Sequence, residues 1–411
     1  MEDSVKDVFE LGYMRMIRFS LSTIAQWPNK NFGTKTRAAR IQSGYHYILV
    51  TIIVVGECSC ALYLWRNRKI LDFFNIGHVY GNILMTALLI QRITLNFQNK
   101  YCSVLKKFAS EFHLMHHAHK SDFAAKEHSR INRFCKIVTI VNHVQVACGL
   151  PMYLGVPHFN NIRAGMFSEN RPANKTFEQS VYYELPFDCT TDVTGYYIMF
   201  FYNWYPAYNV CAAMCIIDVT IFVIVFHILG HLNVLMHNMK YFPRPSDENE
   251  QSEREYNEQA FGLLKDLVQH YQIIKEFMSD TSSAFDMTLF VYLAFHQLNG
   301  CVLLLELSSM KAEAIIKYGL LTFFTFQQLI QTSVIFEQIS SKSEQLAHKV
   351  YGLPWELMDT KNRKIVLLLF TDVQKKLALK VCSIVPVGVT TMSAIIKTTI
   401  SYFMLLNTIA K

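Results

Sequence analysis

Hydroxyl-bearing residues follow one face of the last apolar stretch of the chain, residues 382–411. The stretch is long enough to cross a bilayer, since about 20 helical residues span the hydrocarbon core. In a membrane, a polar stripe of this kind belongs against another helix or against water. The sequence is therefore compatible with Ser/Thr packing between two helices and with a pore-lining helix closed near its end by Leu405 and Ile409. The stripe consists of Thr391, Thr398, Ser401, Leu405 and Thr408.

Ionisable residues inside apolar stretches are a second group of candidates, because a membrane segment retains them mainly for function. Lys397 lies deep in the last stretch, where it is expected to pair with an acid or to face a water-filled vestibule. Asp218 is near the middle of a long stretch, which favours a structural role. Arg92, Asp286 and Glu306 are close to the ends of theirs, so we expect these side chains to reach the membrane surface.

Histidines cluster in two segments of the sequence. The first contains His113, His116, His117 and His119, and the second contains His227 and His231. Zinc would need a glutamate beside the second pair, as in HExxH, or nearby cysteines, and neither is present. We expect these histidines to lie on solvated helix faces. No Ser-His-Asp set, phosphate-binding glycine loop or paired carboxylates stand out either. The sequence predicts no enzyme, no catalytic residue, no metal site and no cofactor.

Composition points to a membrane protein. Of the 411 residues, 51% are apolar and only 17% are charged, which is ordinary for a chain with several spans and sizeable loops. The net charge of +7 is spread over loops and shows no basic arm, so nucleic acid is excluded as a partner and membrane lipid is expected. The ten cysteines contain no CxxC pair, which excludes a disulfide framework.

The apolar stretches predict an all-α membrane protein with seven transmembrane helices. Between the fourth and fifth spans, residues 240–260 are polar and charge-rich, which predicts a flexible loop, and an amphipathic helix follows at 261–278. Residues 337–380 form a soluble stretch before the last span. No internal repeat is visible, which argues against an inverted-repeat transporter. The expected spans are 45–64, 74–97, 134–154, 196–229, 284–307, 314–336 and 382–411.

The orientation of the chain depends on one sequon, Asn174-Lys175-Thr176, between spans three and four. Glycosylation at Asn174 would place this loop outside, the N-terminus in the cytoplasm and the C-terminus outside. A G-protein-coupled receptor has the opposite orientation. The chain also lacks an Asp-Arg-Tyr triplet after its third span and an Asn-Pro-x-x-Tyr motif in its seventh, which makes that alternative the weaker one.

The C-terminal part of the chain resembles the insect odorant receptors. The resemblance is carried by Tyr351, Trp355, the pairs Arg363-Lys364 and Gln374-Lys375, and the run SYFMLL at 401–406. The proline that commonly follows the Gln-Lys pair is absent. Gustatory relatives carry a Thr-Tyr pair where this chain has Ser401 and Tyr402. Six residues beyond the Tyr they carry Gln-Phe, where this chain has Thr408 and Ile409. The gustatory pattern therefore fits less well, and a gustatory-type receptor remains the alternative. The co-receptor Orco has a much longer loop between spans four and five, so the chain is more similar to a ligand-specific subunit.

The resemblance implies a seven-helix subunit that forms, with Orco, a heterotetrameric nonselective cation channel gated by a small volatile odorant. Its location would be the plasma membrane of olfactory sensory neurons. The implied divisions are a cytoplasmic segment at 1–44, a six-span ligand-binding bundle at 45–336, a cytoplasmic anchor at 337–380 and a pore-lining helix at 381–411. Leu405 and Ile409 would occupy gate-like positions, and Thr408 would influence permeation. The residues implied in subunit assembly are Tyr351, Trp355, Arg363, Lys364 and Gln374.

An odorant site needs apolar walls and one or two polar groups for orientation. On the inferred topology, the outer halves of spans two, three, four and six would supply both. The Asn203 amide and the Tyr80 and Tyr318 hydroxyls are the candidate hydrogen-bonding groups. The expected ligand-binding residues are Phe74, His78, Val79, Tyr80, Ile83, Val144, Ala147, Cys148, Pro151, Met199, Phe200, Asn203, Trp204, Tyr318, Leu321, Thr322 and Thr325.

Overall fold

The computed structural model describes residues 8–29, 32, 37–71, 73–169, 171–172, 175–245, 250–308, 312–382 and 384–409. Its elements are almost all helical. They are α2 (Gly12–Thr23), α3 (Arg37–Asn67), α4 (Phe73–Ile93), η1 (Leu95–Phe97), α5 (Asn99–Lys107), η2 (Phe108–Phe112), η3 (Leu114–Lys120), α6 (Asp122–Arg163), α7 (Val193–Lys240), α8 (Glu250–Ser308), α9 (Ala312–Tyr351), η4 (Trp355–Leu357), α10 (Thr360–Val373), β1 (Lys380–Val381), β2 (Val385–Pro386) and α11 (Val389–Ile409).

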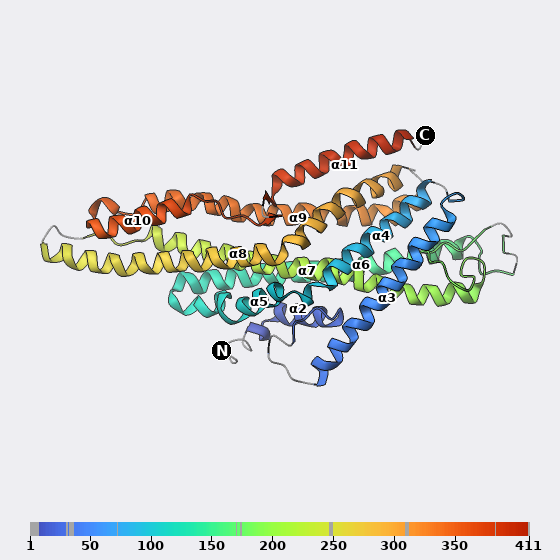
Figure 1. Ribbon diagram of the computed structural model, residues 1–411, viewed down its shortest axis with the longest axis horizontal. Helices are drawn as coiled ribbons and strands as arrows, with labels where there is room; N and C mark the ends of the chain where they lie inside the picture. Colours follow the sequence, from blue (N-terminus) through green and yellow to red (C-terminus); the bar gives the residue numbers. More distant parts are fainter. Residues whose placement is uncertain are drawn as a thin grey trace.

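The helices have membrane-spanning dimensions. Five of those in the described ranges, α3, α6, α7, α8 and α9, are long and apolar enough to cross a bilayer. The helices α4 and α11 have 21 residues each, which at 1.5 Å per residue matches a hydrocarbon core of about 30 Å. These features confirm the predicted all-α membrane fold class. Figure 1 shows an elongated molecule with α10 toward one end and the start of α7 at the other, while α11 runs along the upper edge.

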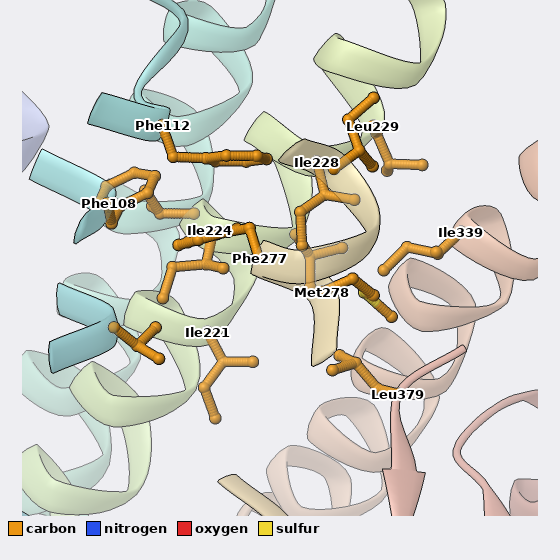
Figure 2. Packing of buried hydrophobic residues seen from close by; sticks show 14 of the residues in the cluster. Phe108, Phe112, Ile221, Ile224, Ile228, Leu229, Phe277, Met278, Ile339 and Leu379 are labelled. Atoms are coloured by element: carbon orange, nitrogen blue, oxygen red, sulfur yellow. The ribbon is translucent and has the colours of Figure 1, made fainter. Parts of the chain in front are cut away.

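The centre of the bundle is α7, which packs against α6, α9, α4, α8 and α2. Its middle part, from Cys215 to Leu229, is apolar on almost every side, and such a helix is stable only when it is surrounded. Figure 2 shows Ile221, Ile224 and Ile228 of α7 among side chains from η2, α8 and α9. The rings of Phe112 and Phe277 stack there with centroids 3.8 Å apart.

One prediction of a flexible loop is wrong in part. Residues 240–260 were expected to lack regular structure, but α8 begins at Glu250 and continues without a break to Ser308. The charged and polar residues of this segment are good helix formers. In addition, Tyr256, Ala260 and Leu264 recur at helical spacing and are buried, so the segment has an apolar face of its own.

The last helix is attached to the bundle along one side only. The strands β1 and β2 pair antiparallel before the helix, so α11 starts at Val389, later than the apolar stretch itself. Ile395 and Thr399 are buried where α11 packs on α8 and α9. Gly300 of α8 makes this close approach possible, because a Cβ there would lie 3.1 Å from the Thr399 methyl group. In Figure 1, α11 lies at the edge of the molecule.

Candidate ligand-binding site

A cavity of about 140 Å³ lies between α4, α6, α7 and α9, beneath the segment that connects α6 to α7. Most of its wall is apolar, and methionines and aromatic rings contribute much of it. Such side chains suit a small apolar ligand, since they adapt to irregular shapes. The lining residues are Asn82, Met85, Thr86, Gln145, Val146, Gly149, Met152, Tyr153, Val181, Tyr183, Pro206, Ala207, Val210, Cys211, Met214, Cys215, Leu320, Leu321, Phe324, Thr325 and Gln328.

Two lining residues belong to a buried hydrogen-bond network at one end of the cavity. The Tyr153 hydroxyl is 2.5 Å from Asn82 Oδ1 and 2.8 Å from the Ser180 carbonyl oxygen. His78 Nε2 lies 2.9 Å from the same carbonyl, and the Tyr318 hydroxyl lies 2.9 Å from His78 Nδ1. These distances fit a histidine that donates from Nε2 to Ser180 and accepts from Tyr318. The network gives a mostly apolar cavity a fixed polar wall.

The connecting segment that covers the cavity is tied to α3. Ser59 Oγ donates to the Glu184 carbonyl at 2.7 Å, and the Glu184 amide lies 3.2 Å from the Ser59 carbonyl oxygen. Arg66 adds an ion pair with Glu184 at 2.6 Å. Through these contacts the segment holds Val181 and Tyr183 over the cavity, so entry of a ligand would have to move the segment or pass between helices.

A buried ion pair supports the opposite end of the cavity. Arg92 of α4 is fully buried and lies 2.7 Å from Asp218 of α7. Its guanidinium also donates to the carbonyls of Ala213 and Met214, at 3.0 and 2.6 Å. Met214 lines the cavity, so Arg92 connects the cavity wall to the centre of the bundle. The prediction that Arg92 reaches the membrane surface is wrong, because the side chain turns inward to its buried partner.

The other three ionisable residues of the apolar stretches, Glu306, Asp286 and Lys397, have surroundings unlike those of the Arg92–Asp218 pair. Glu306 is buried against Gly77, so it does not reach the surface as expected. Asp286 is half-buried. Lys397 is exposed on α11 and makes no ion pair with any described residue of the chain.

The structure brings only some of the predicted ligand-binding residues to the cavity. Leu321 and Thr325 line it, and His78 and Tyr318 connect to it through the Ser180 carbonyl, which also accepts from Asn82 and Tyr153. Seven others are buried or half-buried without lining it: Val79, Ile83, Met199, Phe200, Asn203, Trp204 and Thr322. Five lie on the outer surface of the bundle: Tyr80, Val144, Ala147, Cys148 and Pro151. The side chain of Phe74 and the sequon residue Asn174 lie outside the described residues.

The sequence did not predict several of the residues that line the cavity, among them Asn82, Gln145, Tyr153, Phe324 and Gln328. Three of these are amides inside apolar spans. An amide facing lipid would be unsatisfied, so its presence could have marked the interior face of each helix. Gln328 shows the point, since its Nε2 lies 3.3 Å from the sulfur of Cys215 on α7.

Most of the predicted pore residues lie on a part of α11 that the other described residues of the chain leave exposed. Thr398, Ser401, Leu405 and Thr408 are exposed, and Thr391 is half-buried. Ser401 and Thr408 donate to carbonyls one turn earlier, and Thr398 also contacts Gln297 of α8 at 2.6 Å. The hydroxyl hydrogens are thus satisfied within the subunit, while their oxygens remain able to accept. The side chain of Ile409 lies outside the described residues.

The predicted assembly residues gather around η4 and α10. Tyr351 and Trp355 are exposed rings 6.4 Å apart, and Trp355 Nε1 donates to the Tyr351 carbonyl. Arg363 donates to the Glu356 carbonyl at 2.9 Å. Lys364 and Gln374 are exposed. The exposed apolar residues Leu357, Leu367 and Leu368 lie in the same region.

The prediction that the histidines lie on solvated faces is wrong for three of them. His113, His227 and His231 are fully buried. The rings of His113 and His227 are 4.0 Å apart and share the Tyr13 hydroxyl, while His231 bonds His270 at 2.9 Å. These buried side chains hydrogen-bond to one another in place of water. Among the residues described, no group of three or more His, Cys, Asp or Glu is arranged to hold a metal ion.

Comparison with known proteins agrees with this architecture. Two solved structures share the fold: an insect olfactory receptor, OR5 from Machilis hrabei, with a TM-score of 0.74 at 14% identity over 97% of this chain and 99% of that one, and the same receptor in complex with eugenol, with a TM-score of 0.73 at 14% identity over 98% and 100%. No curated protein matches by sequence. The sequence profile of the family described as 7tm Odorant receptor matches residues 100–400. This chain therefore belongs to the 7tm odorant receptor family.

Proposed function

We propose that this chain is a ligand-specific odorant receptor subunit, and not Orco, and that the cavity between α4, α6, α7 and α9 binds its odorant. The cavity carries the proposal, because it combines an apolar wall, one polar end and a covering segment. An apolar cavity of about 150 Å³ holds a benzene-sized molecule, so about 140 Å³ suits a small volatile compound. The receptor bound to eugenol has the same fold, which supports a ligand of this size class.

The remainder of the proposal concerns the channel. Opening would create, together with Orco, a nonselective cation pore in the plasma membrane of olfactory sensory neurons. The uncovered polar face of α11 supports a role for residues 381–411 as the pore-lining seventh helix. The exposed apolar residues near α10 support residues 337–380 as the cytoplasmic anchor of a heterotetramer. Residues 1–44 would be cytoplasmic, residues 45–336 would form the ligand-binding bundle, and Asn174 would be glycosylated outside.

The test is to record currents from cells that express the chain with and without Orco across a panel of volatiles. Phe324 lines the cavity and packs on Gly149, whereas its neighbour Phe323 is exposed on the outer surface. We expect current only with both subunits. A bound ligand would complete the burial of the half-buried Phe324 ring, and full burial of such a ring contributes about 1.5–3 kcal/mol, so Phe324→Ala should raise the half-maximal odorant concentration by up to about 100-fold.

The matched control is Phe323→Ala, which removes the same ring from the lipid-facing side and should change the odorant response less than threefold. Equal shifts in the two variants would contradict the assignment of the cavity. Current that needs no Orco, or a response that depends on a G protein, would contradict the heteromeric channel.

A further inference from the structure

A large basic groove lies on the bundle at the end remote from the odorant cavity. It has a volume of about 660 Å³ and is formed by the first turns of α6, the last turns of α7 and the extension of α9. Its lining carries six basic side chains and a single carboxylate, Glu127. The six are Lys126, Arg130, Arg133, Lys240, Lys342 and Lys349.

The positive charge of the groove exceeds the negative charge that its lining supplies. Glu127 is already engaged, since its Oε1 accepts from Arg130 at 2.6 Å and from Asn233 at 2.8 Å. Within the described part of the chain, Lys126, Arg133, Lys342 and Lys349 form no ion pair. Three lysines elsewhere in the chain do form ion pairs: Lys107 with Glu276 and Asp280, Lys275 with Asp372, and Lys376 with Glu344. The groove therefore gathers six cations around one engaged carboxylate, and the described residues form no ion pair with four of them.

The groove lies where the lipid-facing surface ends. On α6, exposed apolar residues begin with Phe134, directly after Arg133, and continue through Ile137 and Val144. On α9, Val334 is the last exposed apolar residue before the groove, and Lys342 follows eight residues later, about 12 Å along the helix axis; the exposed Tyr351 stands apart at the end of the helix. The basic side chains are thus at the depth of lipid headgroups and not in the bulk solvent.

The floor of the groove contains a pair of stacked rings. Phe123 of α6 and His237 of α7 stack with ring centroids 3.7 Å apart, and Met236 lies beside them. Arg and Lys side chains converge over this floor from three helices. A single phosphate would leave most of them unpaired, whereas several phosphates on one headgroup would engage them together.

We propose that this groove binds the headgroup of an anionic lipid that carries more than one phosphate, a polyphosphorylated inositol lipid of the adjacent leaflet. The bound headgroup joins α9 to α6 and α7. Because Glu337 of α9 accepts from the Val389 amide at the start of α11, at 3.1 Å, occupancy of the groove also fixes the base of the last helix. The binding step does not depend on the proposed channel function.

Binding is measured with the full chain, purified in neutral detergent micelles, and a fluorescent short-chain phosphatidylinositol bisphosphate. The groove variant is Arg133→Gln/Lys342→Gln/Lys349→Gln. The charge-matched control is Lys106→Gln/Lys265→Gln/Lys375→Gln, which removes three exposed lysines outside the groove. We expect the groove variant to raise the dissociation constant at least tenfold and the control to change it less than twofold. The variant Lys342→Arg/Lys349→Arg should retain binding, which separates loss of charge from misfolding.

Three results would overturn the proposal. Equal weakening in the groove variant and in the control would show nonspecific attraction. Displacement by soluble inositol bisphosphate at the same concentration as by the lipid would assign the groove to a soluble polyphosphate. Stronger competition by an acidic peptide would assign it to a protein partner. Conversely, retention of the chain on vesicles of phosphatidylcholine with 5% of the inositol lipid, but not on phosphatidylcholine alone, supports it.

Discussion

Arg92 and Asp218 show how one ion pair can be essential inside an apolar bundle. Arg92 is fully buried, bonds two backbone carbonyls of α7 and also lies 5.6 Å from the Tyr292 ring centroid. With so many partners, its charge is accommodated at the junction of α4, α7 and α8. Removal of the carboxylate alone would leave a buried cation without its counter-charge, which costs about 3–5 kcal/mol in comparable sites.

We therefore expect Asp218→Ala to lower the unfolding free energy of the purified protein by about 3 kcal/mol, measured by thermal unfolding in detergent. Arg92→Met/Asp218→Leu should recover most of this loss, because neither charge remains. The control is Glu184→Ala, which breaks the Arg66–Glu184 pair; its side chains are 56% and 25% exposed, and such pairs contribute about 0–1 kcal/mol. Equal losses in Asp218→Ala and Glu184→Ala would contradict a special role for the buried pair.

At the scale of elements, buried histidines fasten the η2–η3 segment to α2 and α7. His113 contacts Tyr13 of α2 and His227 of α7, and the backbone amide of Leu114 donates to His227 Nδ1 at 3.2 Å. Burial lowers the pKa of His113 well below its usual value, and positive charge on the neighbouring His128, His116 and His117 would lower it further. His113 is therefore neutral in the folded chain at neutral pH.

This depressed pKa predicts loss of stability in acid. The unfolded chain takes up a proton at His113 near pH 6.5, whereas the folded chain does so only at lower pH. Below about pH 6.5 the unfolded state therefore gains about 1.4 kcal/mol per pH unit from this one group. We expect the melting temperature to fall between pH 7.5 and pH 5.5. His113→Asn should flatten this dependence, while His119→Asn, at an exposed site, should not; equal slopes in all three proteins would contradict the assignment.

The helices themselves could be predicted from sequence, but their rotations could not. Apolar length alone indicates a span, so α3, α7 and α9 contain the expected stretches. A helix that is apolar on all sides carries little information about which side faces lipid, and for this reason Tyr80 and Val144 were expected in the site but lie on the outer surface. The buried His227 and Arg92 needed partners more than a hundred residues away, which no local pattern reveals.

At the scale of the whole molecule, the cavity and α11 differ in how far the rest of the chain covers them. The cavity between α4, α6, α7 and α9 lies within the bundle, whereas Lys397, Ser401 and Leu405 of α11 are left exposed by the other described residues. A subunit with such a face is incomplete alone, because exposed hydroxyls and a lysine in a spanning helix require water or another chain beside them. The family resemblance and this face together favour a shared central pore. The cavity reaches α11 through α9, which lines the first and packs against the second.

Lys397 offers a test of that arrangement at the level of the assembled channel. It shares the exposed face of α11 with Thr398, Ser401 and Leu405. If this face lines the pore, a fixed positive charge there repels the permeating cations, so Lys397→Gln should raise the single-channel conductance and Lys397→Glu should raise it further, without a change in the half-maximal odorant concentration. Lys106→Gln, which removes a lysine far from α11, is the control and should leave conductance unchanged. An unaltered conductance in both Lys397 variants would mean that this face of α11 packs against a neighbouring subunit or lipid, and the pore would then have to be formed by other residues.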